Sequence, residues 1–385
     1  MTAFRISPKS EVLFGERVSY QAGRKAMALG CSKVLCVYDQ GVKEAGLVAP
    51  IVENMEKAGL EVVHYGNVLA DPPDAMVNEC GELARKEKVD GIVGIGGGSS
   101  LDTAKAVNVL LGNPGTIERY VGPGIGHKPG KPLVLIPTTA GTGSEVTHMA
   151  VITKTRNNAK DSVMGVATIA SLAIVDPLLT LGLPPHITSA TGMDTFAHAL
   201  EAYTSDGRNT MSDMLAEKAL ELVTAYLPKA VRDGSDVEAR TNMSFACLIA
   251  GMSFNDAIPH FGHAFGHTLG AIHHVPHGTG CAIALPGVIE IAAGVIPNKV
   301  RRVGELMGLR LSEALSPAEV GKQVSDRMIA FNKELGIPTL KELNVKESDL
   351  FRLAAGTLGD GCFLFLPKKI GMQNVLSIIQ KAYAV

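Results

Sequence analysis

Histidine residues are concentrated in one short stretch of the sequence. Six of the eleven histidines fall between positions 260 and 277. A second pattern lies upstream, where Asp194 and His198 stand four positions apart and would therefore share one face of a helix. One carboxylate and several imidazoles are ligands that a divalent metal of borderline hardness accepts. The spacing therefore predicts a metal site.

The candidate ligands come from both patterns. His263 and His267 would share a helix face, and His277 is expected in a loop after Pro276. Three imidazoles and one carboxylate complete an inner shell with room for a substrate oxygen. This set holds no thiolate, so Fe²⁺, Zn²⁺, Mn²⁺ or Co²⁺ could occupy it, and affinity alone would favour zinc over iron. The absence of an HExxH motif disfavours a zinc protease.

Two glycine-rich turns follow apolar segments that are typical of strands. Residues 94–99 (GIGGGS) open a helical pattern, and residues 137–144 (PTTAGTGS) follow the next strand. Glycine allows a ligand to approach the backbone closely, and a helix N-terminus offers N–H groups to a phosphate. If the two strands are parallel neighbours, both turns face the ligand crevice of an open α/β sheet. Asp39, at the end of an earlier strand, would then bind a ribose 2′-hydroxyl.

Simpler interpretations of these turns remain open from the residues alone. Residues 94–99 do not follow the GxGxxG spacing, because position 99 is Ser, and they could form an ordinary strand-to-helix turn. Residues 137–144 could be a flexible loop, and Asp39 could be a helix N-cap.

The elements that must position these residues change in kind near residue 184. Before it, strand-like segments alternate with helical patterns, which predicts a parallel sheet covered on both faces. The strands are expected at 33–37, 61–64, 91–95, 133–136 and 173–175. A helical pattern follows the first strand up to Lys57, and helices are expected at 74–88 and 99–111. After it, helical periodicity dominates, with clear helices at 211–229, 237–254 and 317–335. We therefore predict an α/β dinucleotide-binding domain (1–184) of Rossmann-like type and an all-helical metal-binding domain (185–385).

Composition excludes several classes of protein. The 385 residues are 46% hydrophobic with a net charge of −2, and no basic stripe suggests a nucleic-acid partner. The N-terminus lacks the apolar core of a signal peptide, and the most apolar stretch is too interrupted to span a membrane. Six cysteines without a CxxC pair are typical of reduced thiols, so a cytoplasmic protein is expected.

Five segments together resemble the iron-containing (group III) alcohol dehydrogenases over essentially the whole chain. This family includes lactaldehyde reductases and 1,3-propanediol dehydrogenases. The most specific segments are TGMDTFAHALEAY (191–203) and HAFGHTLGAIHHVPHG (263–278). The others are GIGGGSSLDTAKA (94–106), PTTAGTGSEVT (137–147) and DPLLTLGLPP (176–185).

The resemblance implies a role for each matching residue. It implies metal ligation by Asp194, His198, His263 and His277, with His267 beside the metal as a proton-relay or nicotinamide-side residue. It places the pyrophosphate of a dinucleotide on Gly97, Gly98 and Ser99, with Asp102 nearby. Further cofactor contacts would come from Thr138, Thr139, Thr142, Ser144 and Lys160, and Asp39 would favour NAD over NADP.

Some positions depart from the family pattern or carry no clear role. Met149 stands where some members have Asn near the nicotinamide, and His260 stands where a small or apolar residue is common. His260 is therefore expected in the pocket wall or behind the ligands. Phe254 and Cys362 fall where the family lines its substrate pocket, although both could be core residues.

The expected activity is hydride transfer between NAD and a small primary alcohol or diol, or the corresponding aldehyde, with Fe²⁺ or alternatively Zn²⁺ polarising the substrate oxygen. The resemblance also implies a homodimer or larger homo-oligomer. One alternative is a metal-dependent hydrolase whose glycine turns bind a substrate phosphate. Others are a glycerol dehydrogenase or 3-dehydroquinate synthase of the same architecture, or a metal-binding scaffold without catalysis.

Overall fold

The computed structural model describes residues 10–122, 124–156 and 159–385. These residues divide into two compact units, residues 10–182 and residues 183–385. The change from one unit to the other coincides with the Leu-Pro-Pro segment at 183–185.

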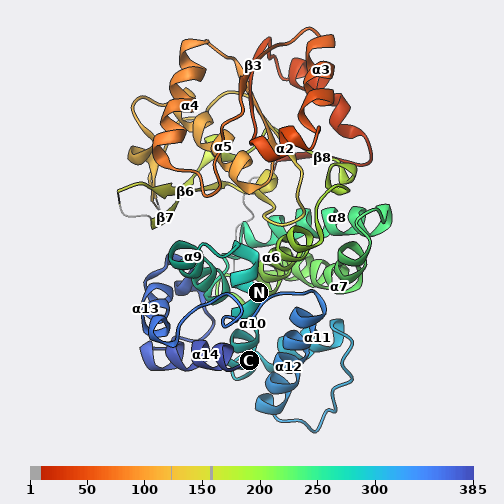
Figure 1. Cartoon of the computed structure of the whole chain (residues 1–385), viewed down its shortest axis with the longest axis vertical. Helices are drawn as coiled ribbons and strands as arrows, with labels where there is room; N and C mark the ends of the chain where they lie inside the picture. Colours follow the sequence, from red (N-terminus) through yellow and green to blue (C-terminus); the bar gives the residue numbers. More distant parts are fainter. Residues whose placement is uncertain (1–9, 123, 157–158) are drawn as a thin grey trace. The chain divides into compact units, whose positions relative to one another are not determined.

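The first unit, coloured from red to yellow-green in Figure 1, is built on a six-stranded sheet. Its strand order is β1-β8-β5-β4-β2-β3. Every neighbouring pair in it is parallel. The strands are β1 (Glu11–Phe14), β2 (Lys33–Val37), β3 (Glu61–Tyr65), β4 (Gly91–Gly96), β5 (Leu133–Pro137) and β8 (Leu172–Val175). The chain adds β3 outside β2 and then returns to place β4 on the other side of β2. The carboxyl ends of β2 and β4 therefore flank a topological switch point, where sheets of this kind bind ligands.

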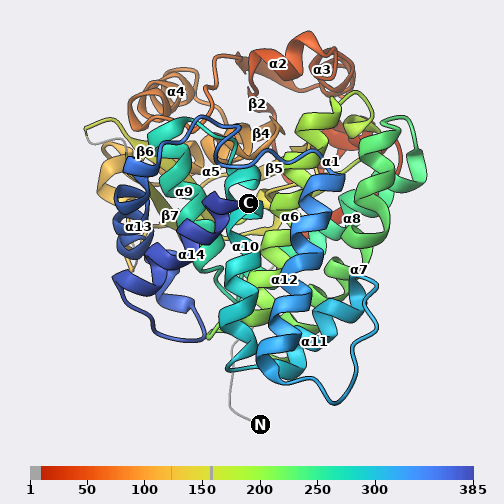
Figure 2. The same cartoon turned by 60° about the horizontal axis from the view of Figure 1, so that its bottom comes forward.

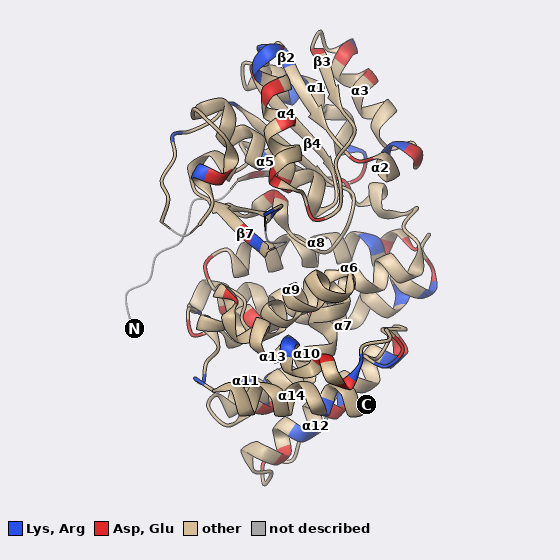
Figure 3. Ribbon diagram, turned by 60° about the vertical axis from the view of Figure 1, so that its left-hand side comes forward, with Lys and Arg blue, Asp and Glu red and all other residues tan. Residues whose placement is uncertain are grey.

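Both faces of the sheet are covered, as predicted. Successive strand residues point to opposite faces, so Leu35 and Ile92 belong to one buried cluster while Val34 and Val93 belong to the other. The first cluster includes apolar residues of α4 (Asp74–Lys86) and α5 (Gly98–Gly112), and the second those of α1 (Ala22–Ala28) and α3 (Val48–Lys57). Acidic and basic residues are interspersed on the helices and loops (Figure 3).

Two features of this unit differ from the prediction. The helical pattern expected between the first strand and Lys57 forms two helices, α2 (Gln40–Glu44) and α3, because Gly46 adopts a φ of +76° that ends the first one. An antiparallel pair, β6 (Met149–Lys154) and β7 (Ala159–Met164), was not predicted. The sequence of β7, AKDSVM, is mostly polar and lacks the alternation that marks a half-buried strand.

The second unit is helical throughout its described residues, as predicted. Its helices are α6 (Pro185–Thr204), α7 (Thr210–Arg232), α8 (Val237–Phe254), α9 (Phe261–His273), α10 (His277–Ala293), α11 (Pro297–Leu306), α12 (Pro317–Glu334), α13 (Leu350–Gly359) and α14 (Met372–Ala384). Helix α12 begins with the predicted capping box of Ser316 and Glu319. It ends before Gly336, whose φ is +69°.

Helix α10 is the centre of this unit. It packs against α6, α9, α12 and α14, which surround it in Figure 2. Its residues are apolar on nearly every side, the pattern of a helix that is buried all round. Among the described residues, no helix is both long and apolar enough to span a bilayer.

Candidate metal centre and cofactor turns

Close packing of α6, α9 and α10 brings the predicted ligands together. A Cβ atom on Gly278 would lie 2.0 Å from the Ala190 carbonyl oxygen of α6. A Cβ atom on Gly266 of α9 would lie 2.8 Å from the Cys281 sulfur of α10. Side chains at these two positions would force the helices apart, so glycine is required for their approach.

Three of the four predicted metal ligands surround a carboxylate oxygen of the fourth, Asp194. From Oδ1 of Asp194, the nearest ring nitrogens are His277 Nε2 at 3.6 Å, His263 Nε2 at 3.9 Å and His198 Nδ1 at 3.9 Å. Asp194, His198 and His263 are buried, and His277 is partly exposed. Three imidazoles and a carboxylate that converge in a buried place are a donor set suited to a divalent metal.

The prediction that His277 lies in a loop was wrong. His277 is the first residue of α10, and Pro276 is its N-cap residue. Proline lacks an N–H group, but the first N–H groups of a helix have no intrahelical partner, so Pro276 is tolerated there. The ligand is therefore fixed to a buried helix.

The start of α10 adds a thiol that was not predicted. Ligand atoms of Asp194, His263, His277 and Cys281 all lie within 4.8 Å of one another, and Cys281 is fully buried. Its sulfur lies 3.6 Å from Nε2 of His277. The two residues are four positions apart, a relation that places them on one face only if both are helical.

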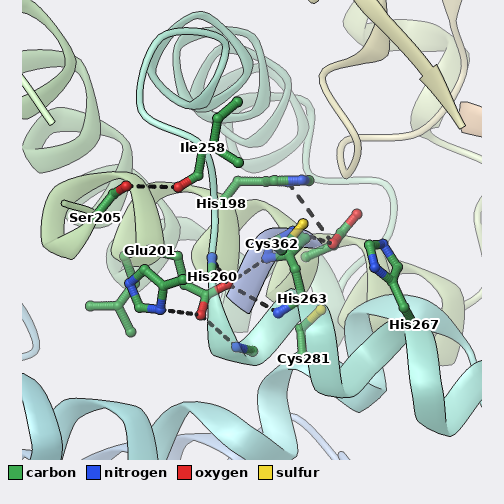
Figure 4. Close-up of polar contacts among 12 residues, drawn as sticks. His198, Glu201, Ser205, Ile258, His260, His263, His267, Cys281 and Cys362 are labelled. Carbon is green, nitrogen blue, oxygen red and sulfur yellow. Dashed lines mark hydrogen bonds and ion pairs between the residues drawn. The ribbon is translucent and has the colours of Figure 1, made fainter. Parts of the chain in front are cut away.

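A buried carboxylate, Glu201 of α6, lies behind the ligands (Figure 4). Oε2 accepts hydrogen bonds from Nδ1 of His263 at 2.6 Å and from its backbone N–H at 3.0 Å. Oε1 lies 2.9 Å from Nδ1 of His260. Burial alone would raise the pKa of Glu201, but the imidazoles of His260 and His263 hold the pKa well below its usual range.

Glu201 also determines which nitrogen of His263 faces the ligand cluster. Because the Nδ1–H group of His263 donates a hydrogen bond to Glu201, the neutral form of this imidazole has its lone pair on Nε2, which lies 3.9 Å from Oδ1 of Asp194. Among the described residues, this buried Nε2 has no hydrogen-bond partner. An imidazole fixed by a carboxylate, with its other nitrogen left as an acceptor, is the usual arrangement of a metal-binding histidine. The residues present therefore fit a metal.

Glu201 was not predicted, although its spacing from Asp194 in the sequence could have indicated it. It lies seven positions after Asp194, and hence on the same face of the helix. His260 lies behind the ligands, as expected of a residue outside the inner shell: its Nε2 is 2.9 Å from the hydroxyl of Thr204. The ring of Phe254 stacks on His198, with centroids 4.1 Å apart.

His267 lies beside the ligand cluster and is held by Asp360. Its Nδ1 is 2.9 Å from Oδ2 of Asp360, and its ring stacks on His277 with centroids 5.0 Å apart. The other oxygen of Asp360 accepts the N–H of Cys362 at 2.8 Å. Burial would raise the pKa of Asp360, but the His267 imidazole lowers it. Asp360 was not predicted, because it is 93 positions away from His267.

In the α/β unit, the two glycine-rich turns lie side by side. Strands β4 and β5 are parallel neighbours with Gly96 opposite Pro137, so both turns leave the same edge of the sheet. Gly97 is the N-cap of α5, and Gly98 and Ser99 form its first turn. A Cβ atom on Gly98 would lie 2.6 Å from the Thr142 side chain. The start of α5 thus lies against the second turn and offers the N–H groups without an intrahelical partner that can bind phosphate.

The remaining threonines and Asp39 lie around this helix start. Thr139 is the nearest side chain to Gly97, and the N–H of buried Thr138 donates to the Gly96 carbonyl at 2.9 Å. Asp39 is the N-cap of α2, accepting the N–H of Val42, and its other oxygen accepts the Ser100 hydroxyl at 2.9 Å. Asp39 is therefore a helix N-cap, which was one of the two roles that the sequence left open. It also lies at the switch point of the sheet.

Asp102 and Lys105 connect α5 to the segment after the second turn. Asp102 accepts the Ser144 hydroxyl at 2.6 Å and the Val151 N–H at 2.9 Å. The fully buried Lys105 ammonium donates to the Thr147 hydroxyl at 2.9 Å and to the Met149 carbonyl at 2.8 Å. Both oxygens of Asp102 are thus occupied by the protein itself. We call Asp102 and Lys105 the α5 clamp.

The clamp holds charges out of water. Burial lowers the pKa of Lys105 to about 8, and burial raises the pKa of nearby Glu145 to about 7. Lys160, predicted to contact the cofactor, lies on β7 with its ammonium 2.7 Å from the Asp71 carboxylate.

The sequences of both units match models of one known protein family. Residues 8–177 match the model described as iron-containing alcohol dehydrogenase, and residues 188–383 match the C-terminal model of the Fe-containing alcohol dehydrogenase family. The chain belongs to the iron-containing alcohol dehydrogenase family. The chain is 36% identical to the NAD-dependent methanol dehydrogenase of Bacillus methanolicus over 99% of its length and 100% of that relative.

Solved structures support the same assignment for this alcohol dehydrogenase. A crystal structure of 1,3-propanediol oxidoreductase matches with a TM-score of 0.95 and 34% identity, covering 99% of this chain and 100% of that one. Sulfoacetaldehyde reductase from Bifidobacterium kashiwanohense, solved with NAD⁺, matches with a TM-score of 0.90 and 27% identity over 100% of both chains. These relatives are oxidoreductases, so the alternative of a hydrolase receives no support.

Proposed function

We propose that this alcohol dehydrogenase uses NAD to oxidise a small primary alcohol or diol, or to reduce the corresponding aldehyde, at a divalent metal. Asp194, His198, His263 and His277 would hold the metal. The observation that carries this proposal is the convergence of three imidazole nitrogens within 3.9 Å of one buried carboxylate oxygen.

Each residue of the metal centre has a separate task in this proposal. When bound, the metal would polarise the substrate oxygen and stabilise negative charge on it. Glu201 keeps Nδ1 of His263 protonated, so that Nε2 stays available as a donor of its lone pair. Asp360 orients His267, which would carry the proton released from the alcohol toward solvent.

The α/β unit would bind the dinucleotide. The N–H groups at Gly97, Gly98 and Ser99 would receive the pyrophosphate, with the turn of Thr138, Thr139, Thr142 and Ser144 beside it. Asp39 would accept the ribose hydroxyls and repel a 2′-phosphate, which favours NAD. The NAD named for the methanol dehydrogenase and the sulfoacetaldehyde reductase complex supports this choice.

Other features of the proposal follow the resemblance alone. Lys160 would contact the cofactor from β7, and Asp102 would act through Ser144. Assembly into a homodimer or larger homo-oligomer and a cytoplasmic location stay predictions.

The direct test is to mix the metal-loaded protein with NAD⁺ and a panel of short alcohols and diols, and to follow NADH absorbance. We expect NADH with at least one small primary alcohol, and none from the His263→Ala variant. Release of phosphate from phosphorylated substrates, without NADH from any alcohol, would refute the proposal in favour of a hydrolase.

A further inference from the structure

We propose that Cys281 is a sulfur ligand when the site holds zinc. In that form, Cys281 would take the fourth position of a tetrahedral set with Asp194, His263 and His277. His198 is the predicted ligand that it replaces. This inference rests on the metal site proposed above, and it goes beyond that site by assigning a thiolate to it.

The distances suit a tetrahedral zinc site. With bonds of about 2.0–2.3 Å to nitrogen, oxygen and sulfur, neighbouring ligand atoms of a tetrahedron lie about 3.3–3.8 Å apart. The sulfur of Cys281 is 3.6 Å from Nε2 of His277, which is 3.6 Å from Oδ1 of Asp194. The same oxygen is 3.9 Å from Nε2 of His263, and all four ligand atoms lie within 4.8 Å of one another. Small rotations of these side chains would complete the set.

The fold places this thiol toward the site. His277 and Cys281 are one helical turn apart at the start of α10, so both project from the same face. Opposite them, Gly266 of α9 leaves the space that the sulfur occupies, because a Cβ atom there would lie 2.8 Å from it. Cys281 is fully buried, so its position is set by this packing.

A second observation independently points to a ligand at this place. Nε2 of His263 is buried and aimed at the cluster, and it has no hydrogen-bond partner among the described residues. Figure 4 shows Cys281 and His263 side by side in this region. The group of mutually close ligand atoms includes Cys281 but not His198, whose ring is stacked on Phe254.

A thiolate would change the metal preference of the site. Thiolates are soft ligands that favour zinc, whereas a set of only nitrogen and oxygen donors accepts several divalent metals. Zinc binding would release the proton of the Cys281 thiol to solvent, leaving the thiolate as ligand. We therefore expect this chain to retain zinc more tightly than a version without the sulfur.

The test is X-ray absorption at the zinc edge on the full-length, zinc-loaded protein. We expect a sulfur scatterer at about 2.3 Å beside nitrogen and oxygen at about 2.0–2.1 Å. Cys281→Ser should lose the sulfur scatterer and bind zinc more weakly by more than about tenfold, since loss of even an outer partner of a ligand costs about 10–100-fold. Cys362→Ser is the matched control, because Cys362 lies in the neighbouring group with His267 and Asp360. Its sulfur signal should be unchanged.

The outcomes separate this inference from the proposed function. Bound zinc with only nitrogen and oxygen scatterers would refute the sulfur ligand without refuting the metal site. A sulfur signal that persists in Cys281→Ser would have the same meaning. Failure of the wild-type protein to bind any divalent metal would overturn the proposed function itself. If Cys281→Ser does not fold, loss of the sulfur signal in Cys362→Ser would refute the assignment to Cys281, and its persistence would support it.

Discussion

The two units build their candidate sites in different ways. In the helical unit, side chains are the proposed ligands, and one buried carboxylate, Glu201, orients one of them, His263, through a hydrogen bond. In the α/β unit, backbone N–H groups at the start of α5 are the proposed ligands, and the charged side chains of the α5 clamp hold two segments of the fold together. A substitution in the clamp should therefore act on stability, and a substitution at Glu201 should act on metal affinity as well.

The largest expected effect is on the stability of the α/β unit. Lys105→Met keeps the length of the side chain but removes the buried ammonium that donates to Thr147 and Met149. We expect the free energy of unfolding to fall by about 1–3 kcal/mol for each of the two buried acceptors that lose their donor, the Thr147 hydroxyl and the Met149 carbonyl. Denaturant unfolding measures it, with exposed Lys86→Met as the control. A loss of stability equal to that of the control would contradict the stabilising role of the α5 clamp.

The corresponding substitution in the helical unit should weaken metal binding as well as the start of α9, where backbone N–H groups donate to Glu201. Glu201→Gln removes the negative charge that fixes the proton on Nδ1 of His263. Metal affinity should fall by about 10–100-fold, as for other partners of metal-binding histidines. Competition with a chelator measures the affinity, and exposed Glu221→Gln is the control. An unchanged affinity would contradict the role of Glu201.

A smaller effect is expected at His267. Asp360→Asn should disturb the orientation of this imidazole without removing a metal ligand. We expect kcat to fall by about tenfold, a part of the roughly 10²–10⁴-fold that a positioned proton carrier contributes, while the metal content is unchanged. Asp349→Asn is the matched control, because Asp349 pairs with His273 outside the ligand cluster. Loss of metal from Asp360→Asn would show a structural role instead.

The smallest effect concerns cofactor choice in the α/β unit. Asp39→Gly removes the proposed repulsion of a 2′-phosphate and should raise the ratio of kcat/KM for NADP to that for NAD by about tenfold, or about 1.4 kcal/mol. Loss of the N-cap to Gly costs only a few tenths of a kcal/mol. Asp39→Asn keeps a capping oxygen and removes the charge, so it separates the two roles. An unchanged ratio in both variants would remove Asp39 from cofactor selection.

Strong local patterns predicted much of the fold. The bounds of β2 and α8 agree with the prediction at both ends, because continuous apolar segments and clear periodicity mark them. The antiparallel pair of β6 and β7 was missed, and the mostly polar residues of β7 form a strand through pairing and not through their own pattern.

The candidate site was predictable where its residues lie close together in the sequence. Asp194 and His198, or His263 and His267, are separated by one helical turn, so helical geometry alone relates them. To predict that Cys281 lies at the site, one must know that His277 begins a helix. To predict the same of Asp360, one must know how a distant segment folds back onto α9. Such contacts arise from tertiary packing and leave no local spacing to detect.

The most direct test of the central claim is the metal content of purified protein and of its His263→Ala variant, measured by elemental analysis after exhaustive dialysis. We expect one tightly held divalent ion per wild-type chain and none in His263→Ala, with both proteins folded. An equal metal content in the two proteins, or none in the wild type after loading with iron or zinc, would contradict the proposed centre.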